Sequence, residues 1–86
     1  MDWNSFNSIA IRNESADAIE FDLRPFSEQQ NEAFEFLLDE MLTQADPFGK
    51  FISVKTDASV VLSTKVYANI GKLKEKRVLV HVVRGS

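Results

Sequence analysis

The sequence predicts an α+β domain with two layers, in which one helix packs on one face of a five-stranded, largely antiparallel sheet. Two observations lead to this fold class. Short segments of alternating apolar and polar residues occur on both sides of a single segment with helical periodicity. The chain of 86 residues is long enough for only one modest core and contains no cysteine to support it. Residues 1–86 are therefore expected to form a single small globular domain with the element order ββαβββ.

The first two strands are predicted over residues 6–12 and 18–23. Residues 6–12 alternate weakly, whereas residues 18–23 alternate cleanly, with Ile19, Phe21 and Leu23 on one face. The segment between them is rich in turn-forming residues. The two strands are expected to pair as a hairpin.

A helix is predicted from about residue 28 to residue 44. Ser27 followed three residues later by Gln30 matches a capping box at its start. Apolar residues then recur with helical spacing, and the chain breakers Asp46, Pro47 and Gly49 are expected to end the helix. The apolar stripe consists of Phe34, Leu37, Leu38 and Met41.

Three more strands are expected after the helix, over residues 50–56, 60–70 and 77–83. The middle segment could also be a helix, but every second residue from Val60 to Ile70 falls on one face, so period two is favoured. The segment 71–77, GKLKEKR, is then predicted to be the loop of a hairpin between the last two strands.

Charge divides the chain into two halves. Residues 1–48 contain eleven acids against two arginines, a net charge of −9, and residues 49–86 contain eight basic residues against two acids, a net charge of +6. Such an asymmetry concerns partners and solubility rather than fold. The start of the chain does not resemble a secretion signal, and no apolar run is long enough to span a membrane. A cytoplasmic protein without a membrane partner is expected.

The sequence lacks the residue patterns that enzymes need, so the protein is expected not to be an enzyme and to use no cofactor. It contains no glycine-rich phosphate loop and no G-x-S-x-G nucleophile motif. His81 is the only histidine and is expected to be a structural residue of the last strand. No metal site is expected either, because carboxylates in a row on one helix do not converge on a cation.

The predicted helix carries a row of four acids opposite its apolar stripe. At about 100° per residue, the four lie close to one another, and no lysine or arginine in the helix offsets them. Phe36 lies beside this row and is either an exposed binding anchor or a residue that packs under the N-terminal segment with Trp3 and Phe6. The candidate partner-binding residues are Glu28, Glu32, Glu35, Phe36 and Asp39.

These residues favour a non-catalytic protein-interaction module. Its acidic helix would dock on a basic surface of a partner protein, as an inhibitor, immunity protein or antitoxin would do. A partner protein with a basic surface is therefore the main expectation.

The alternative is a nucleic-acid-binding module that uses the basic hairpin 72–77 and the sheet face left open by the helix. Lys55 and His81 are expected to lie on that face with Lys65 and Tyr67, where Tyr67 would stack on a base. Self-association is a third hypothesis, either basic tip to acidic row or through an edge strand as a homodimer. The candidate nucleic-acid-binding residues are Lys65, Tyr67, Lys72, Lys74, Lys76 and Arg77.

Overall fold

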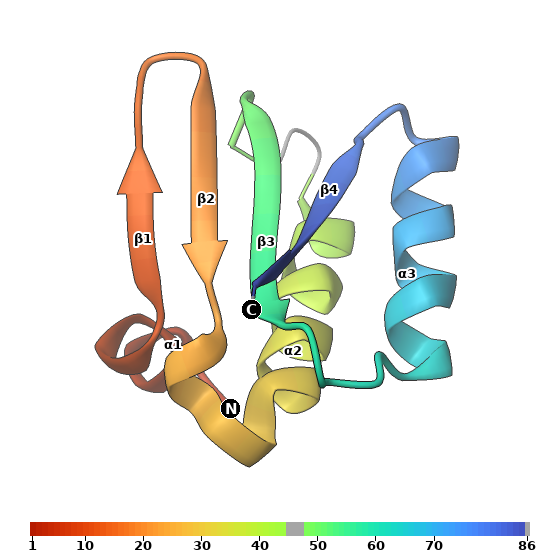
Figure 1. The fold of residues 1–86 in the computed structure, drawn as a ribbon. Coiled ribbons are helices and arrows are strands. Elements are labelled where there is room, and N and C mark those ends of the chain that lie inside the picture. Colours follow the sequence, from red (N-terminus) through yellow and green to blue (C-terminus); the bar gives the residue numbers. More distant parts are fainter. Residues whose placement is uncertain (45–47, 86) are drawn as a thin grey trace.

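The computed structural model describes residues 1–44 and 48–85 and shows a mixed α and β domain with one four-stranded sheet and three α-helices in this part of the chain (Figure 1). The elements follow in this order: α1 (Trp3–Ile9), β1 (Ile11–Glu14), β2 (Ala18–Asp22), a 3-10 helix η1 (Arg24–Gln29), α2 (Gln30–Thr43), β3 (Phe51–Asp57), α3 (Thr64–Glu75) and β4 (Val80–Gly85).

The strands lie in the sheet in the order in which they occur in the chain, β1-β2-β3-β4. The β1–β2 pair is antiparallel, whereas β2–β3 and β3–β4 are both parallel. The prediction of one sheet with helical cover on one face holds at this level, and the predicted β1–β2 hairpin is present. The prediction of five largely antiparallel strands with a single helix is wrong.

The main reason for this difference is that residues 64–75 form a helix instead of most of the strand expected over residues 60–70. Ser63 caps α3, because its hydroxyl accepts a hydrogen bond of 3.2 Å from the Val66 backbone N–H. Val66, Asn69 and Leu73 are the buried residues of α3 and have helical spacing. The helix connects β3 to β4 as a crossover, and the two strands are therefore parallel.

The first predicted strand is also corrected. Residues 3–9 form α1, whose N-cap Asp2 accepts a hydrogen bond of 2.8 Å from the Ser5 backbone N–H, and the strand begins only at Ile11. Phe6 of α1 is fully buried. The turn-forming residues after β1 allow the hairpin with β2, but β1 is shorter than the strand predicted over residues 6–12.

The helix α2 spans residues 30–43, close to the predicted 28–44, but it does not begin with a capping box. Ser27 lies in η1 with φ 55° and ψ −115°, and the Gln30 side-chain amide donates to the Ser27 carbonyl oxygen instead of capping the helix. Of the predicted stop residues, Gly49 lies in a turn with φ 58°, while Asp46 and Pro47 lie outside the described residues.

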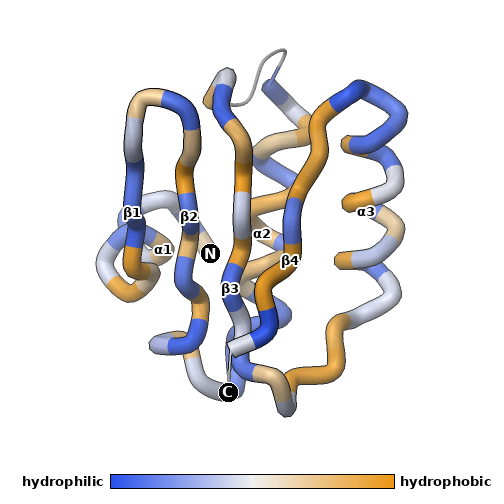
Figure 2. Tube along the Cα trace, turned by 45° about the horizontal axis from the view of Figure 1, so that its top comes forward, coloured by the Kyte–Doolittle hydropathy of each residue, from blue (hydrophilic) through white to orange (hydrophobic). Residues whose placement is uncertain are grey.

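The core lies between the sheet and its helices. One set of alternating strand residues, which includes Ile19, Phe21, Ile52 and Val54, is buried against α1, α2 and α3. Figure 2 shows how hydrophobic and hydrophilic residues alternate along α3, as an amphipathic helix on a sheet requires. Because both crossovers run in the same direction along the sheet, their helices lie on the same side.

Candidate interaction surfaces

The acidic row of the predicted helix is divided between two environments. Glu28 lies in η1 and Glu32 in the first turn of α2, and both are exposed. Glu35 and Asp39 lie where α2 meets α3. There the Glu35 carboxylate accepts a hydrogen bond of 2.9 Å from the Ser63 hydroxyl, and the Asp39 carboxylate accepts one of 2.9 Å from the Asn69 side-chain amide. Half of the row is thus engaged in helix packing.

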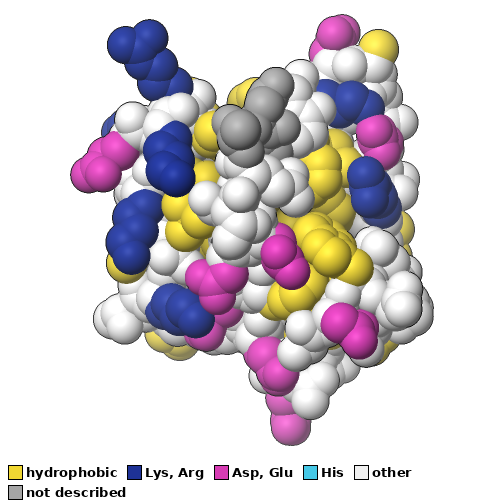
Figure 3. Space-filling model, turned by 180° about the vertical axis from the view of Figure 1, so that it is seen from behind, with side chains coloured by type: hydrophobic (Ala, Val, Ile, Leu, Met, Phe, Trp, Pro, Cys, Tyr) yellow, Lys and Arg dark blue, Asp and Glu magenta, His cyan; other side chains and the backbone are white. Residues whose placement is uncertain are grey.

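Lys65 of α3 adds a charge of the opposite sign at the same place. Its Nζ atom lies 3.0 Å from Asp39 Oδ2 and 4.0 Å from Glu35 Oε1. The hydrogen bond to Asp39 raises the pKa of Lys65 above 10.5. Figure 3 shows the helical side of the molecule, with acidic side chains near its centre and lysines and arginines along the edge formed by α3.

Phe36 lies beside the acidic row but packs inward. Its ring centroid lies 5.1 Å from that of Trp3 and 5.6 Å from that of Phe6, both from α1, and the residue is partly buried. This is the arrangement that the sequence offered as the alternative to an exposed anchor. Aromatic clusters of this kind fix a short helix against a core.

The other candidate residues gather on and after α3. Lys65 and Tyr67 belong to α3 rather than to the sheet face, and Tyr67 is 61% exposed. The expected hairpin is not formed, because residues 72–75 are the last turn of α3, Lys76 is its C-cap and Arg77 follows with φ 64°. The backbone N–H groups of Arg77 and Val78 bond to the carbonyl oxygens of Lys74 and Leu73. Lysines in a last helical turn also complement the helix dipole.

Among the described residues, no helix covers the sheet face that faces the viewer in Figure 1, opposite α2 and α3. We call it the bare face. The register of the strands and their alternation place ten side chains on it: Ile11, Asn13, Ala18, Glu20, Asp22, Phe51, Ser53, Lys55, His81 and Val83.

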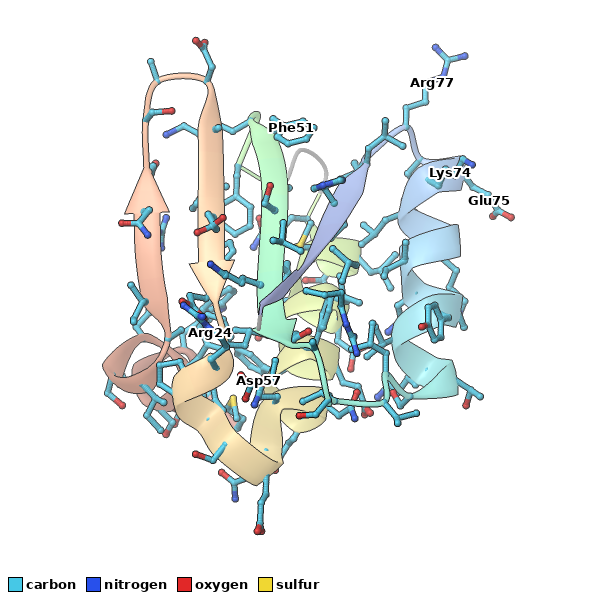
Figure 4. All side chains as sticks on the ribbon, in the orientation of Figure 1. Arg24, Phe51, Asp57, Lys74, Glu75 and Arg77 are labelled. Atoms are coloured by element: carbon cyan, nitrogen blue, oxygen red, sulfur yellow. The ribbon has the colours of Figure 1, made fainter. Side chains whose placement is uncertain are left out.

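The apolar part of the bare face centres on Phe51 at the start of β3. Phe51, which is labelled in Figure 4, is 56% exposed. Its ring centroid lies 6.1 Å from that of His81 on β4. Ile11, on the edge strand β1, is 50% exposed. The alternation of residues 50–56 predicted correctly that Phe51 and Lys55 lie on the face away from the core. It did not indicate that Phe51 is the main exposed apolar residue of that face.

A shallow hollow adjoins the bare face at the end where β3 and β4 begin. It has a volume of about 580 Å³, and its lining includes Asp17, Lys50, Phe51, Arg77 and Leu79. Lys50 is engaged in an ion pair with Glu14, which lowers the pKa of that carboxyl. The hollow is open and mixes both signs of charge, so it extends the Phe51 surface rather than forming a separate enclosed site.

The opposite end of the bare face carries an ion pair. Arg24 donates to both oxygens of the Asp22 carboxylate, with distances of 3.0 Å from Nε to Oδ1 and 2.7 Å from Nη2 to Oδ2. These bonds hold the pKa of Asp22 below 3.8. Gly85 lies under this pair, since an added Cβ there would approach Arg24 to 3.2 Å. Asp22 is therefore almost buried although it points to the bare face.

Over residues 1–44 and 48–85, no cluster of three or more histidine, cysteine or acidic side chains is arranged to hold a metal ion. In the same part of the chain, every helix is too short or too polar to cross a membrane.

No family model, curated protein or solved structure matches this chain.

Proposed function

We propose that this protein is a non-catalytic interaction module that binds another protein through the bare face of its sheet. The observation that carries the proposal is the direction of its strands. Parallel sheets are generally covered on both faces, whereas antiparallel sheets often leave one face to water. Here β2, β3 and β4 are parallel, and the helices of residues 1–44 and 48–85 lie on one side of the sheet. A covering partner would complete the arrangement.

The side chains of the bare face support the same proposal. Phe51 and Ile11 are each at least half exposed, and an aromatic residue rimmed by polar groups is a common anchor of protein interfaces. The acidic row of α2 is less suited to docking than the sequence suggested. Glu35 and Asp39 already have partners on α3, and Phe36 is covered by α1.

Site-specific photo-crosslinking tests this proposal. The photoreactive analogue p-benzoylphenylalanine replaces Phe51 in one protein and Tyr67 in another, and each is irradiated in living cells. Tyr67 is the matched control, because it is an aromatic residue of similar exposure on α3. We expect a discrete crosslinked protein species from position 51 and none from position 67. Crosslinks only from a third position, Glu32, would instead place the partner on the acidic row.

Nucleic-acid binding is the second candidate, and the Phe51–His81 ring pair is the observation that favours it. Neighbouring rings on an open sheet can stack on successive bases. Glu20 on the same face opposes it, since its carboxylate repels phosphates. The test is fluorescence polarisation with short single-stranded RNA and DNA at low and physiological salt. Binding that Phe51→Ala weakens would favour this candidate.

A further inference from the structure

We propose that the bare face binds the bare face of a second copy of this chain, around a two-fold axis that runs along the strands between β2 and β3. This inference rests on the proposed function, since it names the partner of the same surface. Such an axis lays β2 of one copy over β3 of the other, and β1 over β4. A row here means the side chains that are register partners from β1 to β4. In the dimer, each row of one copy faces the same row of the other copy in reverse order.

The row that crosses the sheet at Lys55 brings apolar side chains together when it is reversed. From β1 to β4 it consists of Ile11, Asp22, Lys55 and Val83, which is apolar, acidic, basic and apolar. In the proposed dimer Ile11 meets Val83 twice, and each Lys55 meets the Asp22–Arg24 ion pair of the other copy, in which Arg24 already covers the carboxylate. The charged groups of this row lie between the two apolar contacts, which favour this register.

The next row towards the start of β3 consists of Asn13, Glu20, Ser53 and His81. Reversal places Glu20 opposite Ser53, whose hydroxyl can donate a hydrogen bond to the carboxylate. It also places Asn13 opposite His81, where the amide and the imidazole each offer a donor and an acceptor. Like charges do not meet in this row.

The third row matches side chains by size. Ala18 and Phe51 are register partners on β2 and β3, so the axis places Phe51 of each copy over Ala18 of the other. Facing sheets lie about 10 Å apart and need a large residue opposite a small one to interdigitate. The most exposed aromatic residue of the sheet thus meets its smallest side chain.

The size of the face predicts a weak dimer. Four strands about 4.8 Å apart and about five residues long cover roughly 300 Å² in projection. A standard interface buries about 800 Å² of accessible surface on each partner. We therefore expect dissociation in the micromolar range or above, with an equilibrium that must be followed at protein concentrations up to about 1 mM.

Sedimentation velocity of the purified protein over this concentration range tests the proposal. The wild type is expected to show a monomer–dimer equilibrium. Phe51→Ala removes the anchor, Ala18→Phe makes two phenylalanines collide, and Ile11→Glu places a charge opposite the apolar side chain of Val83. Each variant is expected to weaken dimerisation at least tenfold. Tyr67→Ala, on the outer side of α3, is the control and should dimerise as the wild type does.

Mixing two variants separates an interface effect from a folding effect. In a mixed dimer of Ala18→Phe with Phe51→Ala, the new phenylalanine lies over the new alanine, and the other half of the interface is native. The mixture should therefore dimerise more tightly than either variant alone. A wild type that stays monomeric would overturn this inference but not the proposed function, which crosslinks from position 51 to a different protein would still support. A dimer unaffected by all three variants would also overturn it, as would a monomer that binds single-stranded RNA through Phe51.

Discussion

The ammonium group of Lys65 on α3 lies 3.0 Å from the carboxylate of Asp39 on α2, in a chain whose two halves carry opposite net charge. The acid comes from the negative half and the base from the positive half. The contact shows that part of the charge asymmetry is used within the molecule. An acidic helix without basic residues of its own, such as α2, acquires them from the helix beside it.

We expect a double-mutant cycle on Asp39 and Lys65 to give a small favourable coupling that decreases with salt. Asp39→Asn keeps an acceptor for Asn69, and Lys65→Met keeps the aliphatic stem, so the cycle isolates the charge interaction. The measurement is urea unfolding of the four proteins at low and high salt. Because Lys65 is exposed, solvent screens the pair. A coupling independent of salt would mean that packing, not charge, joins the two helices here.

Thr56→Val is expected to stabilise the protein by about 1 kcal/mol. Thr56 is fully buried on the core side of β3, and its hydroxyl has no hydrogen-bond partner within the described residues. Valine has nearly the same shape and removes the cost of burying that hydroxyl. The free energy of unfolding is measured by chemical denaturation. Thr56→Ser is the control, since it keeps the hydroxyl, loses a methyl group and should destabilise. A stabilisation by serine would contradict this account.

Arg77→Gly is expected to stabilise the protein by about 0.5–1 kcal/mol. Arg77 follows the C-cap of α3 with φ 64°, a conformation that glycine adopts without steric cost. Arg77→Ala keeps a Cβ atom and should leave the stability nearly unchanged, so the difference between the two variants reports the backbone conformation alone. Equal effects of the two substitutions would point to the charge of Arg77 instead.

Asp22→Asn is expected to reduce stability near pH 7 by about 1 kcal/mol, at the low end for a charged hydrogen bond because Arg24 is partly exposed. Arg24 holds the pKa of Asp22 below 3.8 in the folded protein. The contribution of Asp22 is therefore fully present above the unfolded value and is lost as the pH falls through the folded value. Unfolding curves from pH 7 down to about pH 2 should show the variant and the wild type converging at acidic pH. A constant gap would exclude the ionised carboxylate as its cause.

The sequence correctly predicted the elements whose apolar residues follow a single spacing, either every second residue for a strand or helical spacing for a helix. Residues 18–23 alternate strictly and form β2 over Ala18–Asp22, and the stripe from Phe34 to Met41 forms α2. Local periodicity is sufficient where burial on one face dominates.

The segment that forms α3 was wrongly predicted to be a strand, because its apolar residues fit both alternation and helical spacing. Val60, Leu62, Val66 and Ile70 satisfy an alternation of two, whereas Val66, Asn69 and Leu73 satisfy helical spacing. Asn69 is buried on the helical face, where its amide donates a hydrogen bond to Asp39, a residue 30 positions earlier in the chain. Because this segment was predicted to be a strand and not a crossover helix, the sheet was expected to be largely antiparallel, whereas β4 runs parallel to β3.

The position of the bare face depends on the topology of the sheet, so it could not be predicted from the amino-acid composition. Phe51, Lys55 and His81 were each placed on their own strands correctly, but which face the helices cover depends on both crossovers. Tyr67 and Lys65 were expected on that face only because their segment was taken for a strand. The acidic row was visible in sequence, and its partners Ser63 and Asn69 were not.

The match between strand order and chain order has a consequence for synthesis on the ribosome. Each new strand of this sheet joins the edge left by the strand before it, and none is inserted between two earlier ones. As the chain emerges from its N-terminus, the β1–β2 hairpin can form first, and each later helix–strand unit can add to it in turn. The sheet can be built in one direction, with no step that must wait for a later segment to open an earlier pairing.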